Sequence, residues 1–118
     1  FKGTDMSDFS KALDHVSEQI IKYRKTAPND GNTLVEINQQ ITSTLFYLEK
    51  ERAAYHAKFQ QEIADNVKAG DSVSRAENKA HLSVPEMYLL RKIIDSAYTV
   101  CDSIRTQVSW IKSGIVNV

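Results

Sequence analysis

The chain has 118 residues, with 15 Lys plus Arg balanced by 15 Asp plus Glu, so its formal net charge is zero. This length fits a single domain, and the zero net charge excludes a protein that grips nucleic acid with a generally basic surface. Only 4 Gly and 2 Pro occur, which argues against a turn-rich β protein and predicts an all-α fold. The lone Cys101 precludes an internal disulfide and favours a reducing, cytoplasmic location. No stretch approaches the roughly 18 apolar residues of a membrane span, so no membrane partner is expected.

The N-terminal third predicts one helix and a turn. Apolar residues from Met6 to Tyr23 recur at alternating steps of three and four, the pattern of a helical seam over residues 4–25. The segment 26–32 contains Pro28 and Gly31 and is predicted to be a turn.

A very long helix is expected over 33–69, with Gly70 at its C-terminal cap. It carries a main apolar stripe and a second, weaker one. The main stripe is Leu34, Ile37, Ile41, Leu45, Leu48, Tyr55, Phe59, Ile63 and Val67, and the second is Val35, Phe46, Ala53, Ala57 and Ala64. Two apolar faces predict neighbours on two sides. Such a helix spans roughly 55 Å, whereas a compact domain of this size has a radius of gyration of about 13–14 Å. We therefore expect an elongated fold that forms a homo-oligomer.

The C-terminal half predicts a short helix over 74–82 and a long helix over 84–113. Ser74 with Glu77, and Ser83 with Glu86, have the spacing of a capping box at each start. The last helix carries the most regular seam in the chain: Met87, Leu90, Ile94, Ala97, Cys101, Ile104, Val108, Ile111 and Ile115. The expected architecture is a single elongated helical hairpin or bundle over 1–118, with a long central helix and a long C-terminal heptad helix.

Residue patterns for catalysis are absent from the sequence. The four glycines are isolated, so no phosphate-binding loop is formed. His15, His56 and His81 lie on three different predicted helices, which favours solvated side chains over a metal site. Cys101 lies on the core seam, where a buried inert thiol is expected rather than a nucleophile. We expect neither an enzyme nor a cofactor.

Arg91, Tyr98, Arg105 and Lys112 follow one another at intervals of seven and form a line beside the seam of the last helix. One interpretation is a solvated flank with ion pairs to the interleaved Asp95 and Asp102. The other is a strip that binds phosphates, with a tyrosine for base stacking.

Other polar and aromatic positions also leave two interpretations open. Arg52 interrupts the main stripe, where it could snorkel to solvent or make a buried polar contact that sets the register between subunits. Trp110 lies nearly opposite the seam of the last helix. Three interpretations are open: an interface anchor, a base-stacking platform or an incidentally exposed ring. The cluster Lys22, Arg24 and Lys25 either complements a helix C-terminus or contacts phosphate. The candidate oligomer interface is Trp110, Ile94, Cys101, Ile104, Val108 and Ile111.

The segment 93–105 (IIDSAYTVCDSIR) resembles the C-terminal helix of phage recombination mediator proteins of the UvsY type. The shared features are an aliphatic pair before an Asp, a second Asp seven residues later, and then an Ile followed by a basic residue. A Leu-Glu helix with scattered basic residues, a Gly-Asp-Ser turn and a short helix with Glu and Lys precede it in similar order. The resemblance covers about Leu45 to Ile115.

The resemblance implies a small helical oligomer that binds single-stranded DNA. Such proteins help to load a RecA-type recombinase in the presence of a single-strand-binding protein, and they hydrolyse no ATP. Basic residues midway along the long helix bind DNA in that family, although the positions do not correspond residue for residue here. Together with the line on the last helix, the candidate DNA-binding residues are Lys50, Arg52, His56, Lys58, Arg91, Tyr98, Arg105 and Lys112.

The alternative is a non-enzymatic structural or adaptor protein, such as a virion component, a small packaging subunit or a chaperone. It would use the same helical seams without a DNA-binding face, and the balance of opposite charges favours it.

Overall fold

The computed structural model describes residues 6–114 and consists there of four helices: α1 (Met6–Lys25), α2 (Gly31–Lys68), α3 (Val73–Ser83) and α4 (Pro85–Lys112). The prediction of an all-helical fold is confirmed, and no strand occurs in this range. The molecule measures 63 × 28 × 19 Å and has a radius of gyration of 18.5 Å, well above the value of about 13–14 Å for a compact chain of this length. The predicted elongated shape is therefore also confirmed.

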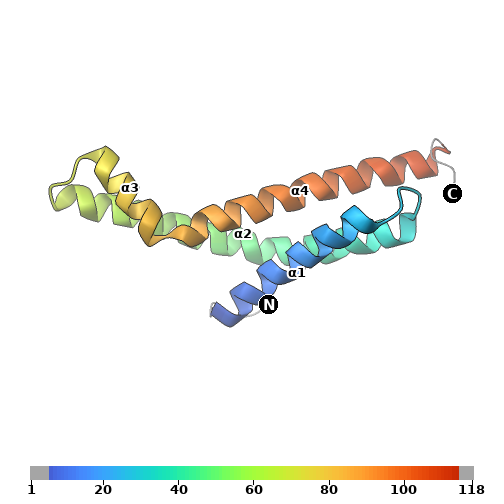
Figure 1. Ribbon diagram of the computed structural model, residues 1–118, viewed down its shortest axis with the longest axis horizontal. Coiled ribbons are helices and arrows are strands. Elements are labelled where there is room, and N and C mark those ends of the chain that lie inside the picture. Colours follow the sequence, from blue (N-terminus) through green and yellow to red (C-terminus); the bar gives the residue numbers. More distant parts are fainter. Residues whose placement is uncertain (1–5, 115–118) are drawn as a thin grey trace.

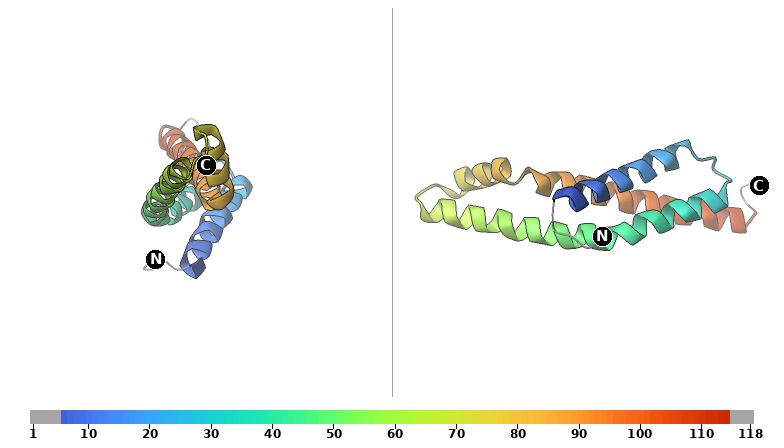
Figure 2. Two further views of the ribbon diagram at one scale, coloured as in Figure 1. Left: turned by 90° about the vertical axis from the view of Figure 1, so that its left-hand side faces the viewer. Right: turned by 90° about the horizontal axis from the view of Figure 1, so that it is seen from below.

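The two longest helices, α2 and α4, run antiparallel along the long axis and form a hairpin (Figure 1). The other two helices cover different ends of this hairpin. α1 lies against both α2 and α4 over one half of the rod, and α3 folds back on α2 at the other end (Figures 1 and 2). The first turns of α1 swing away from α4, so α1 covers the hairpin only in part (Figure 1).

α2 begins two residues earlier than the sequence predicted, inside the expected turn. The side chain of Asp30 accepts a hydrogen bond from the backbone N–H of Thr33 at 3.2 Å, which makes Asp30 the N-cap and allows Gly31 to be helical. Hydrogen bonding to the side chain of Thr33, and then this bond to its backbone, lower the pKa of the Asp30 carboxyl.

α2 ends at Lys68, one residue before the predicted end, and Ala69 is the C-cap; Gly70, predicted as the cap, follows it with a φ of +109°. The N–H of Gly70 bonds to the carbonyl of Val67, and the N–H of Asp71 bonds to that of Asn66. This pair of bonds is a Schellman motif, which favours glycine because a side chain is strained at positive φ.

Both capping boxes predicted for the C-terminal half are wrong. α3 is capped by Ser72, whose Oγ accepts a hydrogen bond from the N–H of Arg75 at 3.2 Å. The backbone is extended at Ser72 and already helical at Ser74, so Ser74 cannot be the cap. α4 has no side-chain cap, since Ser83 is still the last residue of α3. Only Val84 separates the two helices, and the proline after it disfavours a helical conformation there. The predicted first-helix start and the seam position Ile115 lie outside the described residues.

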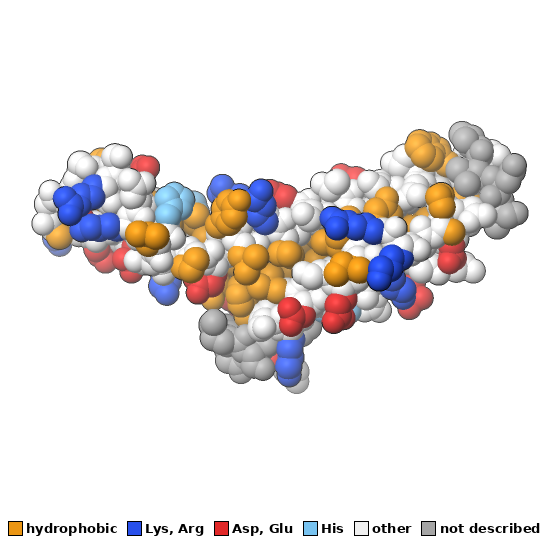
Figure 3. All heavy atoms as spheres, viewed as in Figure 1, with side chains coloured by type: hydrophobic (Ala, Val, Ile, Leu, Met, Phe, Trp, Pro, Cys, Tyr) orange, Lys and Arg blue, Asp and Glu red, His pale blue; other side chains and the backbone are white. Residues whose placement is uncertain are grey.

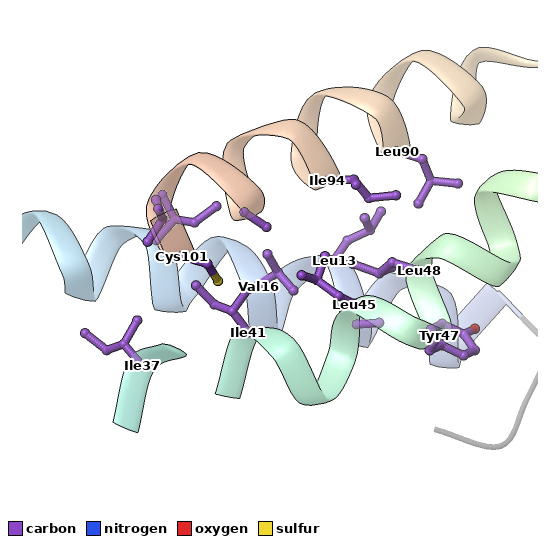
Figure 4. Packing of buried hydrophobic residues seen from close by; sticks show 14 of the residues in the cluster. Leu13, Val16, Ile37, Ile41, Leu45, Tyr47, Leu48, Leu90, Ile94 and Cys101 are labelled. Atoms are coloured by element: carbon purple, nitrogen blue, oxygen red, sulfur yellow. The ribbon is translucent and has the colours of Figure 1, made fainter. Parts of the chain in front are cut away.

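The core runs along the interface of α1, α2 and α4. Leu13 and Val16 of α1 point toward the leucines and isoleucines of α2 and toward Ile94 of α4 (Figure 4). The seams predicted for the first and last helices supply these residues, and α2 contributes its main stripe from Leu34 to Leu48. The apolar steps of three and four thus bury one face of each helix.

A second, smaller cluster lies beneath α3. Phe59 of α2 packs there with Val84 and Met87, and the fully buried Ala76 and Ala80 let α3 approach α2 closely. Beyond this cluster the main stripe loses its cover, and Val67 is exposed near the tip of the hairpin.

The second apolar stripe of α2 is not covered by another helix of the described chain, although Val35 and Ala53 lie at the edge of the space between α2 and α4. All five of its residues are exposed, and Phe46 is exposed at 82%. The expected partner for this face is therefore not supplied by α1, α3 or α4.

Replacing Ser72 by Ala should lower the free energy of unfolding by about 1 kcal/mol, because the N–H of Arg75 loses its acceptor. Ser74→Ala is the matched control and should change stability by less than about 0.5 kcal/mol. Urea unfolding followed by circular dichroism measures both. A larger loss for the Ser74 variant would contradict this assignment of the cap.

Candidate nucleic-acid interface

A groove between α2 and α4 faces away from α1. Gln107 of α4 accepts a hydrogen bond from Tyr23 of α1, so this side of α4 faces α1. Arg105 lies two residues from Gln107, and residues two apart point to opposite sides of a helix. The Arg105 side therefore opens onto the uncovered flank of the hairpin, which we call the α2–α4 groove.

The first hollow of this groove brings together three of the predicted DNA-binding residues. It has a volume of about 260 Å³. Glu49, Arg52 and His56 line it from α2, and Arg91 lines it from α4. Arg52 and His56 share a face of α2 because they are four residues apart, but nothing in the sequence spacing links them with Arg91, since the two helices meet only in the folded hairpin.

A second hollow of about 310 Å³ lies further along the same groove. Arg105 and Lys112 of α4 line it opposite Val35 and Asn38 of α2. Tyr98 lies between the two hollows in the line of heptad positions and is 46% exposed. The predicted line on the last helix is therefore one wall of the groove.

Lys50 and Lys58, the remaining candidates, line neither hollow. Each is exposed on α2. Each lies two positions from a groove residue, Arg52 or His56, and helical geometry turns it toward another side. The structure thus divides the basic residues of the long helix between different faces.

Carboxylates neutralise part of the groove. Arg52 lies 3.7 Å from Glu49, measured between Nη1 and Oε1, and Arg105 forms an ion pair with Asp102. Both pairs are solvent-exposed and link residues three apart on one helix, so each contributes little to stability. Such pairs can exchange a carboxylate for a phosphate at small cost.

The buried charge on α2 is Glu51 and not Arg52, which the sequence had singled out. Glu51 is 8% exposed, whereas Arg52 reaches the surface and pairs there. Neighbouring Tyr55 packs against Phe9 with ring centroids 5.4 Å apart. Burial raises the pKa of the Tyr55 hydroxyl, and the nearby carboxylates of Glu86 and Glu51 raise that pKa further.

The other flank of α4, beside α1, holds a hollow that was not predicted from the sequence. Its volume is about 340 Å³, and Tyr23 of α1 and Trp110 of α4 line it with Ser103, Thr106 and Gln107. The four α4 positions are spaced by three and four, so a polar stripe that ends at Trp110 was visible in the sequence. Trp110 is 46% exposed.

Most residues of the predicted oligomer interface lie in the core of the single chain. Ile94, Cys101 and Ile104 are buried against α1 and α2, and Val108 and Ile111 pack partly on the same cluster. Intramolecular packing therefore uses the seam that was assigned to subunit contacts. Trp110 alone among the six keeps a large exposed surface.

The three histidines are separate, as their positions on different helices predicted. His15 is on α1, His56 lines the groove on α2, and His81 of α3 packs against Phe59 with the rings tilted and their centroids 4.8 Å apart. Over residues 6–114, no group of three or more His, Cys, Asp or Glu side chains is placed to hold a metal ion. Over the same range, none of the helices combines the length and apolarity needed to cross a membrane.

No protein-family model, no curated protein and no solved structure matches this chain.

The buried thiol of Cys101 should react slowly. Burial raises the pKa of Cys101, so the native chain holds less thiolate at any given pH than the unfolded chain. At pH 8 we expect reaction with a disulfide reagent at least about tenfold slower in the native protein than in urea. Because the unfolded thiol ionises first, this group should also make stability fall as pH rises above its ordinary pKa of 9.0. Equal native and unfolded reaction rates would contradict this placement of Cys101.

Proposed function

We propose that this chain is a single-stranded-DNA-binding recombination mediator, which acts as a helical oligomer in the cytoplasm of a bacterial cell and helps to load a RecA-type recombinase. The observation that carries the proposal is the convergence of Arg52, His56 and Arg91 on one open hollow of the α2–α4 groove. The resemblance of segment 93–105 to the mediator family supports the same function, and that segment forms the middle of α4.

The spacing of the cations suits an extended strand. Successive members of the line from Arg91 to Lys112 are seven residues apart, which is about 10 Å along a helix, and the whole line spans about 31 Å. A single strand that follows this line would place several phosphates within reach of the arginines and Lys112. Tyr98, between the two hollows, offers one face for base stacking.

The charge balance of the groove predicts weak binding by one subunit. Glu49 and Asp102 each lie beside a groove arginine, so a phosphate must displace a carboxylate before it binds. Several subunits on one strand would sum these modest contacts, because linked sites raise the effective concentration of one another. An oligomer is therefore part of the proposed mechanism.

The double variant Arg91→Glu/Arg105→Glu should weaken binding of a labelled single-stranded oligonucleotide at least tenfold. It should also make the slope of log affinity against log salt less steep, by the amount expected for the loss of about one to two phosphate contacts. Fluorescence anisotropy across a salt series, with duplex DNA as a competitor, measures both quantities.

Lys11→Glu/Lys68→Glu is the matched control, since it makes the same change in net charge at exposed positions away from the groove. It should weaken binding less than about threefold. Equal losses in the two double variants would show that net charge, and not the groove, attracts DNA. No binding by the unaltered protein at low salt would refute the proposed function.

A second candidate function is a non-enzymatic adaptor or structural subunit of a helical assembly. The observation that favours it is the exposed second stripe of α2, where Phe46 stands among small residues beside the groove. An exposed apolar stripe that includes a phenylalanine at 82% exposure suits a contact with another helix. This contact could join copies of the chain or hold a different protein.

Phe46→Ser should shift self-association to a protein concentration about tenfold higher or more, because burial of a phenylalanine contributes about 1.5–3 kcal/mol. Light scattering over a dilution series measures the shift. Leu82→Ser is the matched control, because Leu82 is as exposed as Phe46 but lies on α3. A monodisperse monomer at micromolar concentration in the unaltered protein would refute the oligomer.

A further inference from the structure

We infer that the hollow between Tyr23 and Trp110 is a nucleobase pocket, in which one unstacked base lies on the indole of Trp110 and the cations at the end of α1 bind the adjoining phosphate. The pocket lies on the flank of α4 opposite the α2–α4 groove. The inference rests on the proposed binding of single-stranded DNA and adds the place where a base is held.

The size and lining of the hollow suit a single aromatic ring system. Its volume of about 340 Å³ is near the lower end of the range for small-molecule sites, which is roughly 300–1,000 Å³. Two aromatic side chains line it, Tyr23 from α1 and Trp110 from α4. Exposed aromatic faces of this kind are the platforms on which single-stranded nucleic acids stack their bases.

One ring of the pocket is already fixed in place. The hydroxyl of Tyr23 donates a hydrogen bond to Oε1 of Gln107 at 3.0 Å, which joins α1 to α4 at the pocket floor. Tyr23 is half-buried and packs on the main core, so its ring is held from behind. Trp110, in contrast, is 46% exposed and offers its ring to a ligand.

Polar groups around the two rings match the edge of a base. The bond from Tyr23 uses the carbonyl oxygen of Gln107 and leaves its amide N–H groups as donors toward the hollow. The hydroxyl of Thr106 donates to the carbonyl of Asp102 at 3.1 Å and keeps lone pairs that can accept. The hydroxyl of Ser103 can do either. An unstacked base presents both donors and acceptors along its edge, so this set can bind it without a charged group.

A source of positive charge adjoins the pocket. Arg24 follows Tyr23 in the chain and lines the next hollow between α1 and α4, of about 360 Å³, which Lys92 and the carboxylate of Asp95 also line. Lys22 and Lys25 are exposed in the same last turn of α1. Figure 3 shows Lys and Arg side chains on this half of the molecule, interspersed with Asp and Glu side chains. A phosphate next to the bound base would therefore meet at least one cation.

The sole tryptophan of the chain makes the pocket directly observable, because all indole fluorescence comes from Trp110. Titration with an unlabelled single-stranded oligonucleotide should quench this fluorescence, since a stacked base contacts the ring. A strand of the same length without bases should leave the fluorescence unchanged, although it carries the same phosphates. Fluorescence at several protein concentrations without DNA is the control for self-association.

Substitutions test the pocket by a second readout. Trp110→Ala should weaken binding of a labelled strand in anisotropy about tenfold, and Trp110→Phe should restore most of the affinity because its ring also stacks. Tyr88→Ala is the matched control, since Tyr88 is an exposed aromatic residue of α4 outside this hollow, and it should leave the affinity unchanged. Circular dichroism of each variant checks that the helices are retained.

The outcomes separate this inference from the proposed function. Strand binding in anisotropy that leaves Trp110 fluorescence and the affinity of Trp110→Ala unaltered would overturn the pocket and leave the groove as the binding site. A fluorescence change caused by protein concentration alone would assign Trp110 to a protein interface and also overturn the pocket. Absence of all binding at low salt would overturn both.

Discussion

A helix of 38 residues cannot bury an apolar stripe by itself, and the antiparallel contact of α2 with α4 is the constraint on which the rest of this structure depends. The seam of α4 covers the stripe from Leu34 to Leu48 and is buried in return. α1 is too short to cover the whole hairpin, so α3 has to fold back over Phe59 at the far end. The rod shape follows from this division, because α1 and α3 cover different lengths of the hairpin instead of packing over the same part of it.

Use of the α4 seam inside the chain decides where partners can bind. The residues of that seam are not available to another subunit, so partners are left with the two flanks of α4 and the outer face of α2. One flank is lined by α1 and holds the Tyr23 and Trp110 hollow, and the other is the open α2–α4 groove. Our two proposals for DNA place the strand and a base on these flanks, whereas the adaptor function uses the α2 face that carries Phe46.

Neutral net charge shapes the proposed mechanism as much as the fold does. In the groove, Glu49 and Asp102 pair with arginines that would otherwise attract phosphate strongly, and both pairs are at the surface, where they contribute little to stability. In the proposed mechanism, binding depends on the exchange of one anion for another and on stacking. A mediator must also release its strand, so contacts that are individually weak and salt-sensitive suit that task.

The sequence by itself determined the helices, their approximate bounds and their buried faces, because the step of three and four residues and the stop at Gly70 are local properties of the chain. Even so, local patterns placed two caps wrongly, since Ser74 and Ser83 have the right neighbours and only the path of the chain after Gly70 makes Ser72 the cap. Tertiary structure alone decided which side chains share a surface. It joined Arg52 and His56 to Arg91, and it paired Tyr23 with Trp110. The physical reason is that periodicity gives the direction of a side chain around its own helix, whereas the rotation and alignment of one helix against another are set by packing over the whole core.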